Sequence, residues 1–196
     1  MIAPGLHDIP AGHVPAMVTH LEMFAPAMAG DMPFPDGITA PREVPDVATY
    51  RTLYAAVGAP WLWASRLTWE DAKLAATLSR DTTEVRVIRQ DGTPVGLVEL
   101  DFSEPGECEL AYFGLVKEAT GRGLGGPMMA LAQSRAFARD IRRLWVHTCN
   151  LDDPRALAFY QKAGFKPFKL AVEIMPDPRL TGIHDRSAAP HVPLID

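Results

Sequence analysis

The spacing of apolar residues changes along the chain and separates several kinds of segment. Residues 13–24 mix β-branched and apolar side chains, which predicts a strand, and Pro15 places this strand at a sheet edge or at a strand start. Residues 26–46 combine Pro, Gly and Asp too densely for a regular element and predict a long loop. Apolar residues then recur every three or four positions over 47–58, which predicts a helix ending at a glycine.

A second short helix precedes a change to strand-like alternation. Thr68, with Asp71 three residues later, approximates a capping box and opens this helix. Three strand-like runs follow, at residues 84–90, 94–102 and 108–116. An Asp-Gly pair separates the first two runs and a Glu-Pro-Gly turn precedes the third, so we expect an antiparallel meander.

The last third of the chain alternates between helix and strand. Apolar periodicity over 124–139 predicts an amphipathic helix, and residues 142–149 return to a strand pattern. Asp153 is expected to cap a further helix, with a proline at its first position and Gly164 just past its end. Residues 165–175 predict a closing strand, and the proline-containing tail after it is expected to wrap the surface or to be mobile.

The composition of the chain narrows the possible classes of protein and of binding partner. The 196 residues are 47% hydrophobic and 22% charged, which is typical of a globular domain that needs no disulfide or metal staple. The net charge of -5 argues against a general nucleic-acid binder and slightly favours a cationic substrate. The start of the chain lacks the pattern of a signal peptide, and no apolar stretch is long enough to span a membrane. We therefore expect a cytoplasmic protein with neither nucleic acid nor membrane as a partner.

The two cysteines, Cys108 and Cys149, are too few for a disulfide framework and form no C-x-x-C motif. A reducing compartment is therefore expected, with no metal site. Either thiol could in principle carry an acyl group, but the sequence pairs neither with a base, so buried packing is the preferred interpretation.

The stretch "ATGRGLGG", residues 119–126, is the clearest candidate for ligand binding. It follows a strand and opens a helix, so its glycines allow backbone N–H groups to approach an anion at a helix N-terminus. Gly121, Gly123 and Gly126 also match a dinucleotide-binding fingerprint, which requires a parallel sheet and an acidic residue about 20 positions later. Asp140 falls instead at the end of a helix, and the preceding strands form hairpins. The dinucleotide hypothesis is therefore the least favoured, and an ordinary tight turn stays an alternative.

The order of elements, together with "FYQKAGF" at residues 159–165, resembles the GNAT superfamily of acyl-CoA N-acyltransferases over residues 84–173. The family's Arg/Gln-x-x-Gly-x-Gly/Ala loop corresponds to Thr120, Gly123 and Gly125. Its Tyr-x-x-x-Gly-Phe motif corresponds to the residues Tyr160, Gly164 and Phe165. The chain departs from the family where Thr120 replaces Arg or Gln, Lys117 replaces a common proline and Asp153 replaces a frequent asparagine.

The resemblance implies an α/β fold with a mixed, mostly antiparallel central sheet and helices on both faces. It implies a single domain over 1–178, in which 1–80 forms the acceptor side, 84–175 forms the acyl-CoA-binding core and 179–196 is a tail. It also implies acetyl-CoA as the co-substrate, with the glycine loop on its pyrophosphate and the strand 112–116 beside its pantetheine arm. The residues implied in cofactor binding are Phe113, Leu115, Thr120, Gly121, Arg122, Gly123, Gly125, Gly126 and Asp153.

Acyl transfer to an amine requires a base for the amine and an acid for the departing thiolate. Tyr160 matches the family position for the acid. Glu109 lies where some members carry a strand glutamate as base, and His147 is an alternative because it titrates near neutrality. Glu22, together with His20, is a further carboxylate that could face the acceptor.

The acceptor itself is hard to predict. Trp61, Trp63 and Trp69 cluster between the two N-terminal helices and either line the acceptor site or form hydrophobic core. The resemblance favours transfer of an acetyl group to a primary amine of a small molecule or peptide. An acyl-CoA-binding sensor or scaffold without turnover is the alternative, and exposed strand edges would suit a homodimer.

Overall fold

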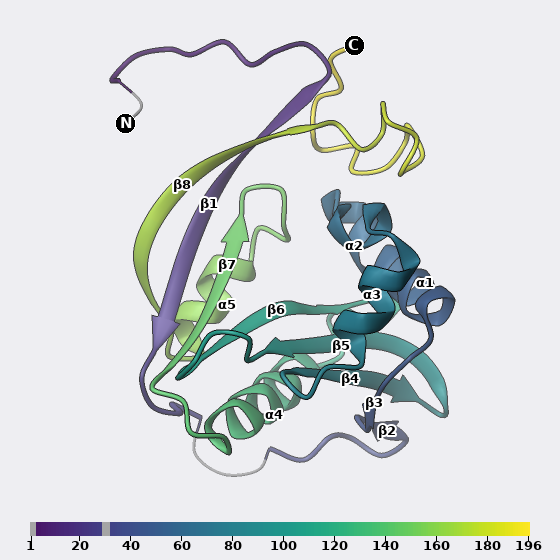
Figure 1. Cartoon of the computed structure of the whole chain (residues 1–196), viewed down its shortest axis with the longest axis vertical. Coiled ribbons are helices and arrows are strands. Elements are labelled where there is room, and N and C mark those ends of the chain that lie inside the picture. The colour runs from purple at the N-terminus through teal and green to yellow at the C-terminus, as the bar shows by residue number, and fades with distance from the viewer. Residues whose placement is uncertain (1–2, 29–31) are drawn as a thin grey trace.

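The computed structural model describes residues 3–28 and 32–196, which contain one mixed sheet flanked by helices (Figure 1). The strands are β1 (His13–Met23), β2 (Ile38–Thr39), β3 (Arg42–Glu43), β4 (Thr83–Gln90), β5 (Thr93–Asp101), β6 (Glu107–Leu115), β7 (Arg143–Cys149) and β8 (Lys166–Pro176). The helices are α1 (Val47–Gly58), α2 (Ser65–Thr68), α3 (Asp71–Leu78), α4 (Gly125–Phe137) and α5 (Ala156–Lys162), with 3₁₀ turns η1 (Ala59–Trp61) and η2 (Lys117–Ala119). Within the described residues, no helix has the length and apolar character needed to cross a membrane.

The strand order is β2-β4-β5-β6-β7-β1-β8, with β3 also pairing with β4. Each neighbouring pair is antiparallel except β6 and β7, which are parallel. The meander β4-β5-β6 is as expected, and its first turn holds Asp91 and Gly92 at positive φ, the geometry of a tight hairpin turn. The expected α/β class with a mostly antiparallel sheet is confirmed.

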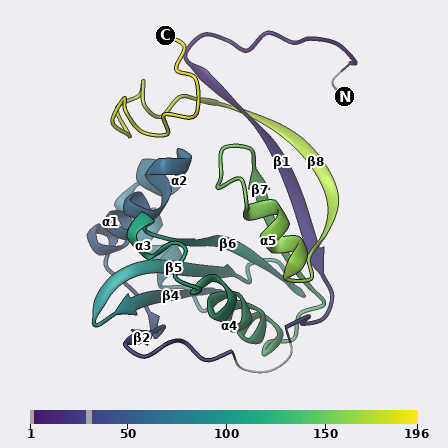
Figure 2. The ribbon, with the colours of Figure 1, turned by 180° about the vertical axis from the view of Figure 1, so that it is seen from behind.

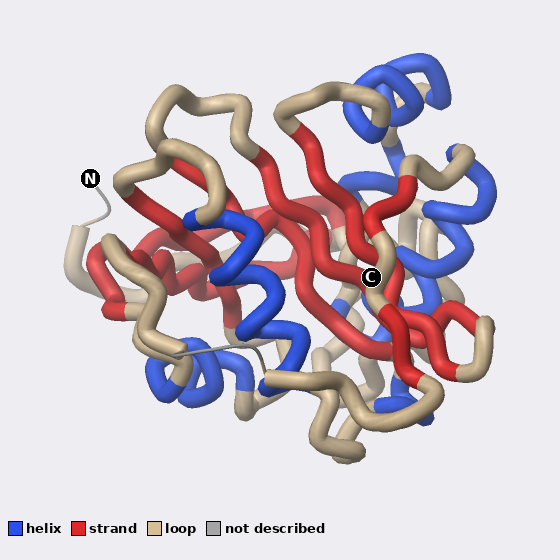
Figure 3. The backbone as a smooth tube through the Cα atoms, turned by 90° about the horizontal axis from the view of Figure 1, so that it is seen from below, coloured by secondary structure: helices blue, strands red, loops and turns tan. Residues whose placement is uncertain are grey.

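Helices cover both faces of this sheet, which is visible in the view from below (Figure 3). On one face, Met128 and Met129 of α4 pack against Leu144 and neighbouring strand residues. On the other face, Tyr54 of α1 and Leu74 of α3 pack against the meander. Figure 2 shows α4 and α5 from behind, with α5 beside β7 and α4 below β5.

β6 and β7 are paired over a short length only. Their ladder runs from Glu107↔Arg143 to Glu109↔Trp145 and then stops, and the two strands diverge in Figure 1. A bulge leaves Ala111 as an extra residue of β6 opposite β5. The remainder of β6 is therefore held by β5 on one side and is released from β7 on the other.

Of the two positions that the sequence allowed for Pro15, the edge is wrong and the strand start is confirmed, because Pro15 is the third residue of β1. β1 lies inside the sheet, between β7 and β8, and β8 forms that edge instead. Pro15 is tolerated because it pairs with Ile174 of β8 in a stretch of β1 that precedes the ladder with β7, which begins at Val18. The missing proline N–H therefore breaks no ladder with β7.

Two predicted helix starts are wrong in detail. Thr68 does not cap α3: it ends α2 and donates its hydroxyl hydrogen to the carbonyl of Ser65, while the N-cap of α3 is Glu70 without a side-chain bond. Asp153 does not cap α5 either, because the carboxylate accepts from the N–H of Arg155 in a turn before the helix begins at Ala156. In both places the side chain forms its hydrogen bond within a local turn and therefore does not cap the helix that follows.

The proline-rich segment is only partly the loop that was expected. Residues 29–31 lie outside the described part of the chain. Within the rest, β2 and β3 add two short pairings to β4, at Ile38↔Gln90 and Arg42↔Arg86. Two-residue strands are too short for an alternation pattern to predict them.

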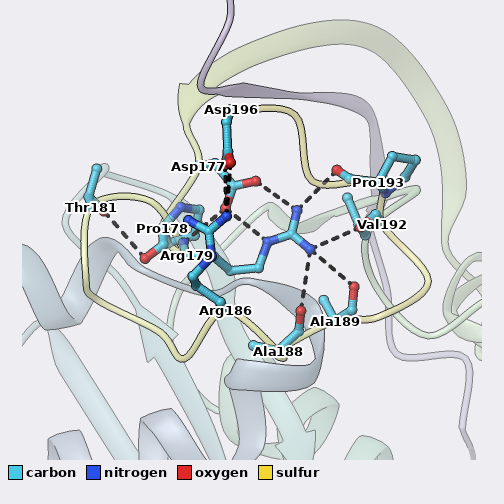
Figure 4. Close-up of polar contacts among 10 residues, drawn as sticks. All are labelled: Asp177, Pro178, Arg179, Thr181, Arg186, Ala188, Ala189, Val192, Pro193 and Asp196. Carbon is cyan, nitrogen blue, oxygen red and sulfur yellow. Dashed lines mark hydrogen bonds and ion pairs between the residues drawn. The ribbon is translucent and has the colours of Figure 1, made fainter.

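The C-terminal tail folds against the beginning of β1 around a buried arginine (Figure 4). Arg179 is 4% exposed, forms an ion pair of 2.7 Å with Asp177 and donates to the carbonyls of Val192 and Pro193. Such a fully bonded guanidinium fixes an otherwise irregular segment. Of the two outcomes expected for the tail, it therefore wraps the surface.

Gly114 allows α1 to approach β6 closely. A Cβ at this position would collide with the Cγ1 methyl of Val57. We expect Gly114→Ala to lower the free energy of unfolding by about 1–3 kcal/mol through overpacking. Urea denaturation measures this loss, and Val57→Ala in the same chain should recover part of it. If the double variant lost as much free energy of unfolding as Gly114→Ala and Val57→Ala lose together, this packing explanation would be contradicted.

Candidate active site

A cavity of about 740 Å³ occupies the region where β6 and β7 diverge. One end is formed by the turn before α4 and by α5, and the other by η1 and the residues that follow it. Of the predicted site residues, the lining includes Phe113, Leu115, Thr120, Gly121, Gly123, Gly125, Gly126, His147, Asp153 and Tyr160. The structure thus brings most of the predicted binding and catalytic residues to one cavity.

The glycine turn has the geometry of an anion site. Gly121 and Gly123 have φ of +82° and +80°, and no atom lies within 4 Å of a Cβ built on either residue. α4 begins at Gly125, and no side chain caps its N-terminus. The first N–H groups of the helix and its positive dipole end are therefore available to a ligand. A pyrophosphate fits the open space at these two glycines, which the side chains of larger residues would occupy.

The three predicted polar residues of the cofactor site differ in whether they line the cavity. Thr120 lines the cavity, and its hydroxyl donates to the carbonyl of Val116 at 3.2 Å. Arg122 is not among the lining residues and instead contacts Gln90 at 3.4 Å. Asp153 lines the cavity in an ion pair with Arg155, whose hydrogen bond lowers the pKa of the carboxyl. Of the predicted cofactor residues, only Arg122 thus lies outside the cavity lining.

Tyr160 is held in an aromatic cluster at the wall of the cavity. Phe113 lies 5.7 Å from Phe159 and 6.3 Å from Tyr160 between ring centroids, and Phe165 packs on the far side of the tyrosine. Burial, with a smaller contribution from Asp152, raises the pKa of Tyr160 well above its usual range. Its phenol is therefore protonated at neutral pH and can act as a donor.

His147 and Glu109 form a pair where the β6–β7 ladder ends: Glu109 is in its last residue pair, and His147 lies two residues beyond it on β7. Nδ1 of His147 lies 3.4 Å from a carboxylate oxygen of Glu109, and 47% of the His147 side chain is exposed. The hydrogen bond to Glu109 raises the pKa of His147, opposed by desolvation and supported by the charges of Asp152 and Glu173. His147 lines the cavity, whereas Glu109 is not among the lining residues and contacts the histidine from behind.

The other predicted carboxylate, Glu22, does not line the cavity. It forms an ion pair of 3.1 Å with Arg143. His20 lies beside His147 at 5.7 Å between ring centroids, and its pKa is lowered by burial and then by the neighbouring histidine. Neither residue is therefore positioned to take a proton from a substrate in this cavity.

Of the two cysteines, only Cys108 has the buried packing position that was preferred for both. Cys108 is fully buried in the core beneath α4, and burial raises the pKa of its thiol. Cys149 lines the cavity, but burial raises its pKa to about 11. Both thiols are therefore protonated at neutral pH and are weak nucleophiles.

The far end of the cavity contains Trp63, which the sequence analysis named, and polar residues that it missed. The N–H of the Trp63 ring donates to Asp152 at 3.1 Å, and Asp152 also accepts from the hydroxyl of Thr148 at 2.7 Å. The hydroxyls of Ser65 and Tyr112 are 2.6 Å apart. Asp152 lies directly before the predicted Asp153, and this position at the end of a strand is the signal that could have identified it.

The three tryptophans of the N-terminal region separate into two groups. Trp61 and Trp63 line the cavity. Trp69 is not a lining residue, and its ring lies 3.8 Å from the ammonium of Lys73 and 4.0 Å from the guanidinium of Arg66.

The comparisons with known proteins agree with this architecture. The model of the GNAT acetyltransferase family matches residues 50–165, so the chain belongs to this family. A GCN5-related N-acetyltransferase from Kribbella flavida is 23% identical with a TM-score of 0.55, over 87% of this chain and 63% of that protein. A GNAT-family protein from Novosphingobium aromaticivorans is 20% identical with a TM-score of 0.56, over 87% of this chain and 70% of that one.

A third similar structure is an aminoglycoside acetyltransferase from an uncultured soil metagenomic sample. It is 16% identical with a TM-score of 0.55, over 66% of this chain and 88% of that protein. At these identities the likeness concerns the fold. The chain spans only 63% of the length of the Kribbella protein. The comparison with curated proteins gave no match.

The open glycine turn leads to a prediction for ligand binding. Gly123→Ala places a methyl group where backbone N–H groups face the cavity and strains a positive φ. We expect the Kd for acetyl-CoA to rise at least about tenfold, equivalent to roughly one charge-assisted hydrogen bond. Gly92→Ala is the matched control, since Gly92 also has positive φ in open space but lies in the β4–β5 turn. Equal calorimetric affinities for both variants and the unaltered protein would refute this placement of the phosphates.

Proposed function

We propose that the protein transfers an acetyl group from acetyl-CoA directly to a primary amine. The observation that carries the proposal is the common cavity of the glycine turn, Tyr160 and His147. Acetyl-CoA supplies an acetyl group activated as a thioester, and an uncharged amine can displace the thiol. The chain must then hold the two substrates together, remove the amine protons and supply a proton to the leaving sulfur.

His147 is the proposed general base, and Glu109 is its positioning residue. The sequence left both residues open as the base, but only His147 faces the cavity. Glu109 favours the imidazolium form and orients the ring through Nδ1, which leaves Nε2 for the substrate. The neutral ring accepts a proton from the bound ammonium group and passes it to solvent. It then accepts the second amine proton as the C–N bond forms.

Tyr160 is the proposed acid for the departing thiolate. Its raised pKa keeps the phenol protonated at neutral pH, so the hydroxyl can donate a hydrogen bond to the sulfur as negative charge develops on it. The same buried environment raises the basicity of the departing thiolate, which allows the proton to pass to it. As the C–S bond breaks, the phenol proton moves to sulfur, and the tyrosine is reprotonated before the next turnover.

The separation of β6 from β7 supports binding of the acetyl group. Beyond Glu109 the described part of β7 provides no ladder partner for β6, so β6 peptide groups on that side can bond a ligand instead. We propose that the strand 112–116 lies along the pantetheine arm and that one of its N–H groups polarises the thioester carbonyl. Phe113 and Leu115, which line the cavity, would pack against the same arm.

The sensor hypothesis rests on Thr120 and Asp153, which differ from the usual family residues. Both line the same cavity as the base and acid candidates, so the groups needed for transfer lie together despite these two departures. A thiol-release assay over a panel of primary amines separates the two functions. Thiol release that depends on an amine supports transfer, whereas acetyl-CoA binding without thiol release in the presence of any amine would support a sensor.

A cytoplasmic location and a homodimer stay predictions from the sequence.

The Glu109–His147 pair predicts a shift in pH dependence. Turnover should rise with pH through the pKa of His147, because the neutral ring is the base. Glu109→Gln removes the interaction that contributes most to raising this pKa, so the rise should move to lower pH. The measurement is kcat/KM against pH, with Glu104→Gln on the exposed β5–β6 turn as control. An unmoved midpoint in Glu109→Gln would remove the pair from the mechanism.

Tyr160→Phe tests the acid. The variant keeps the aromatic packing with Phe113 and Phe165 but removes the hydroxyl, so we expect kcat to fall about 100-fold. The Kd for acetyl-CoA should change little, because the glycine turn is untouched. Steady-state kinetics and calorimetry provide the two values. Unchanged turnover would show that another group, or water, protonates the sulfur.

A further inference from the structure

The end of the cavity beyond His147 is walled by aromatic rings. Trp63 lies 5.3 Å from Tyr112 and 5.6 Å from Tyr54 between ring centroids, and Tyr54 lies 4.9 Å from Tyr112 edge to face. Trp61 also lines this end. Aromatic walls of this kind bind apolar or aromatic bodies through large buried contact areas.

The same end carries negative charge. Asp152 and Glu173 line the cavity, and both contribute to raising the pKa of His147, so they act at the position of the proposed base. Arg155, also on the lining, is paired with Asp153 at 2.6 Å. The carboxylates favour a cation close to His147, and the rings beside Asp152 favour an aromatic or apolar body next to that cation.

The aromatic wall is fixed from outside by the C-terminal tail. Nε2 of His184 lies 2.7 Å from the carbonyl oxygen of Trp63, and the ring of His191 lies 5.9 Å from Trp61 at an edge-to-face angle. The tail itself is held by Arg179 (Figure 4). Asp152 fixes the Trp63 ring from inside the cavity. A wall fixed from both sides is preorganised and does not collapse when the cavity is empty.

We propose that the acceptor is a monoamine: one ammonium group on a short chain attached to an aromatic or similarly apolar body. The ammonium lies near Asp152 and Glu173, and the body packs on Trp61, Trp63 and Tyr112. A flat aromatic or apolar body buries more surface against these rings than the thin chain of a polyamine or the hydroxylated ring of an amino sugar, so both of these are weaker acceptors. This inference rests on the proposed acetyl transfer.

The test compares amines as acceptors with acetyl-CoA as donor. We expect kcat/KM for 2-phenylethylamine and tryptamine to exceed that for spermidine and glucosamine by at least about tenfold, since an aromatic body buries more apolar surface against the rings. Equal or better transfer to spermidine or glucosamine would overturn the acceptor class and leave acetyl transfer standing. Transfer to none of the four would overturn this inference, whereas acetyl transfer itself would fall only if the wider panel of amines also gave no thiol release.

Two pairs of variants test which residues recognise the acceptor. Trp61→Ala should raise KM for tryptamine about tenfold, as expected for loss of a large aromatic contact. Trp69→Ala, outside the cavity, is its control. Glu173→Gln should raise KM about fivefold through loss of one charge interaction, with Glu70→Gln on the exposed start of α3 as control.

The Kd for acetyl-CoA should stay unchanged in all four variants, which separates acceptor recognition from damage to the fold or the cofactor site. Thermal unfolding of each variant provides a second check on the fold. Matching KM values for tryptamine in Trp61→Ala and Trp69→Ala, or in Glu173→Gln and Glu70→Gln, would overturn the assignment of these residues to the acceptor site.

Discussion

The short ladder between β6 and β7 is the constraint on which the rest of the structure depends. After three residue pairs the strands separate, and the sheet continues only because β5 holds β6 and β1 holds β7. The bulge at Ala111 keeps Leu110 and Phe113 in the same core although they are three positions apart. Gly114 lets α1 approach the separated strand. The cavity is therefore built into the sheet and is supported by rigid elements on both sides.

The two ends of the cavity have opposite electrostatic character. At one end, positive-φ glycines and the uncapped start of α4 provide backbone N–H groups and a positive dipole. At the other, Asp152 and Glu173 lie around His147. This polarity would orient an anionic donor and a cationic acceptor head to head, with their reacting atoms near His147 and Tyr160. Positioning of this kind reduces the entropic cost of bringing the two substrates together.

Sequence analysis predicted the local features and missed those that depend on distant partners. The hairpin at Asp91, the glycine turn and the helix ending at Gly164 follow from backbone preferences of a few adjacent residues. The interior position of β1 does not, because its partners β7 and β8 lie more than a hundred residues away and any strand with this pattern could occupy an edge. The bond between Trp63 and Asp152 was missed for the same reason. The resemblance supplied Tyr160, while the geometry selected His147 over Glu109 as the residue facing the cavity.

The central claim is that acetyl-CoA extends from the glycine turn along the separated part of β6. Titration of acetyl-CoA into ¹⁵N-labelled protein, followed through assigned backbone amides, tests it most directly. The account predicts the largest chemical-shift changes at residues 121–126 and 112–116, with smaller changes on the outer strands β4 and β8. Saturable binding that leaves both of these segments unperturbed would place the donor elsewhere and contradict the account.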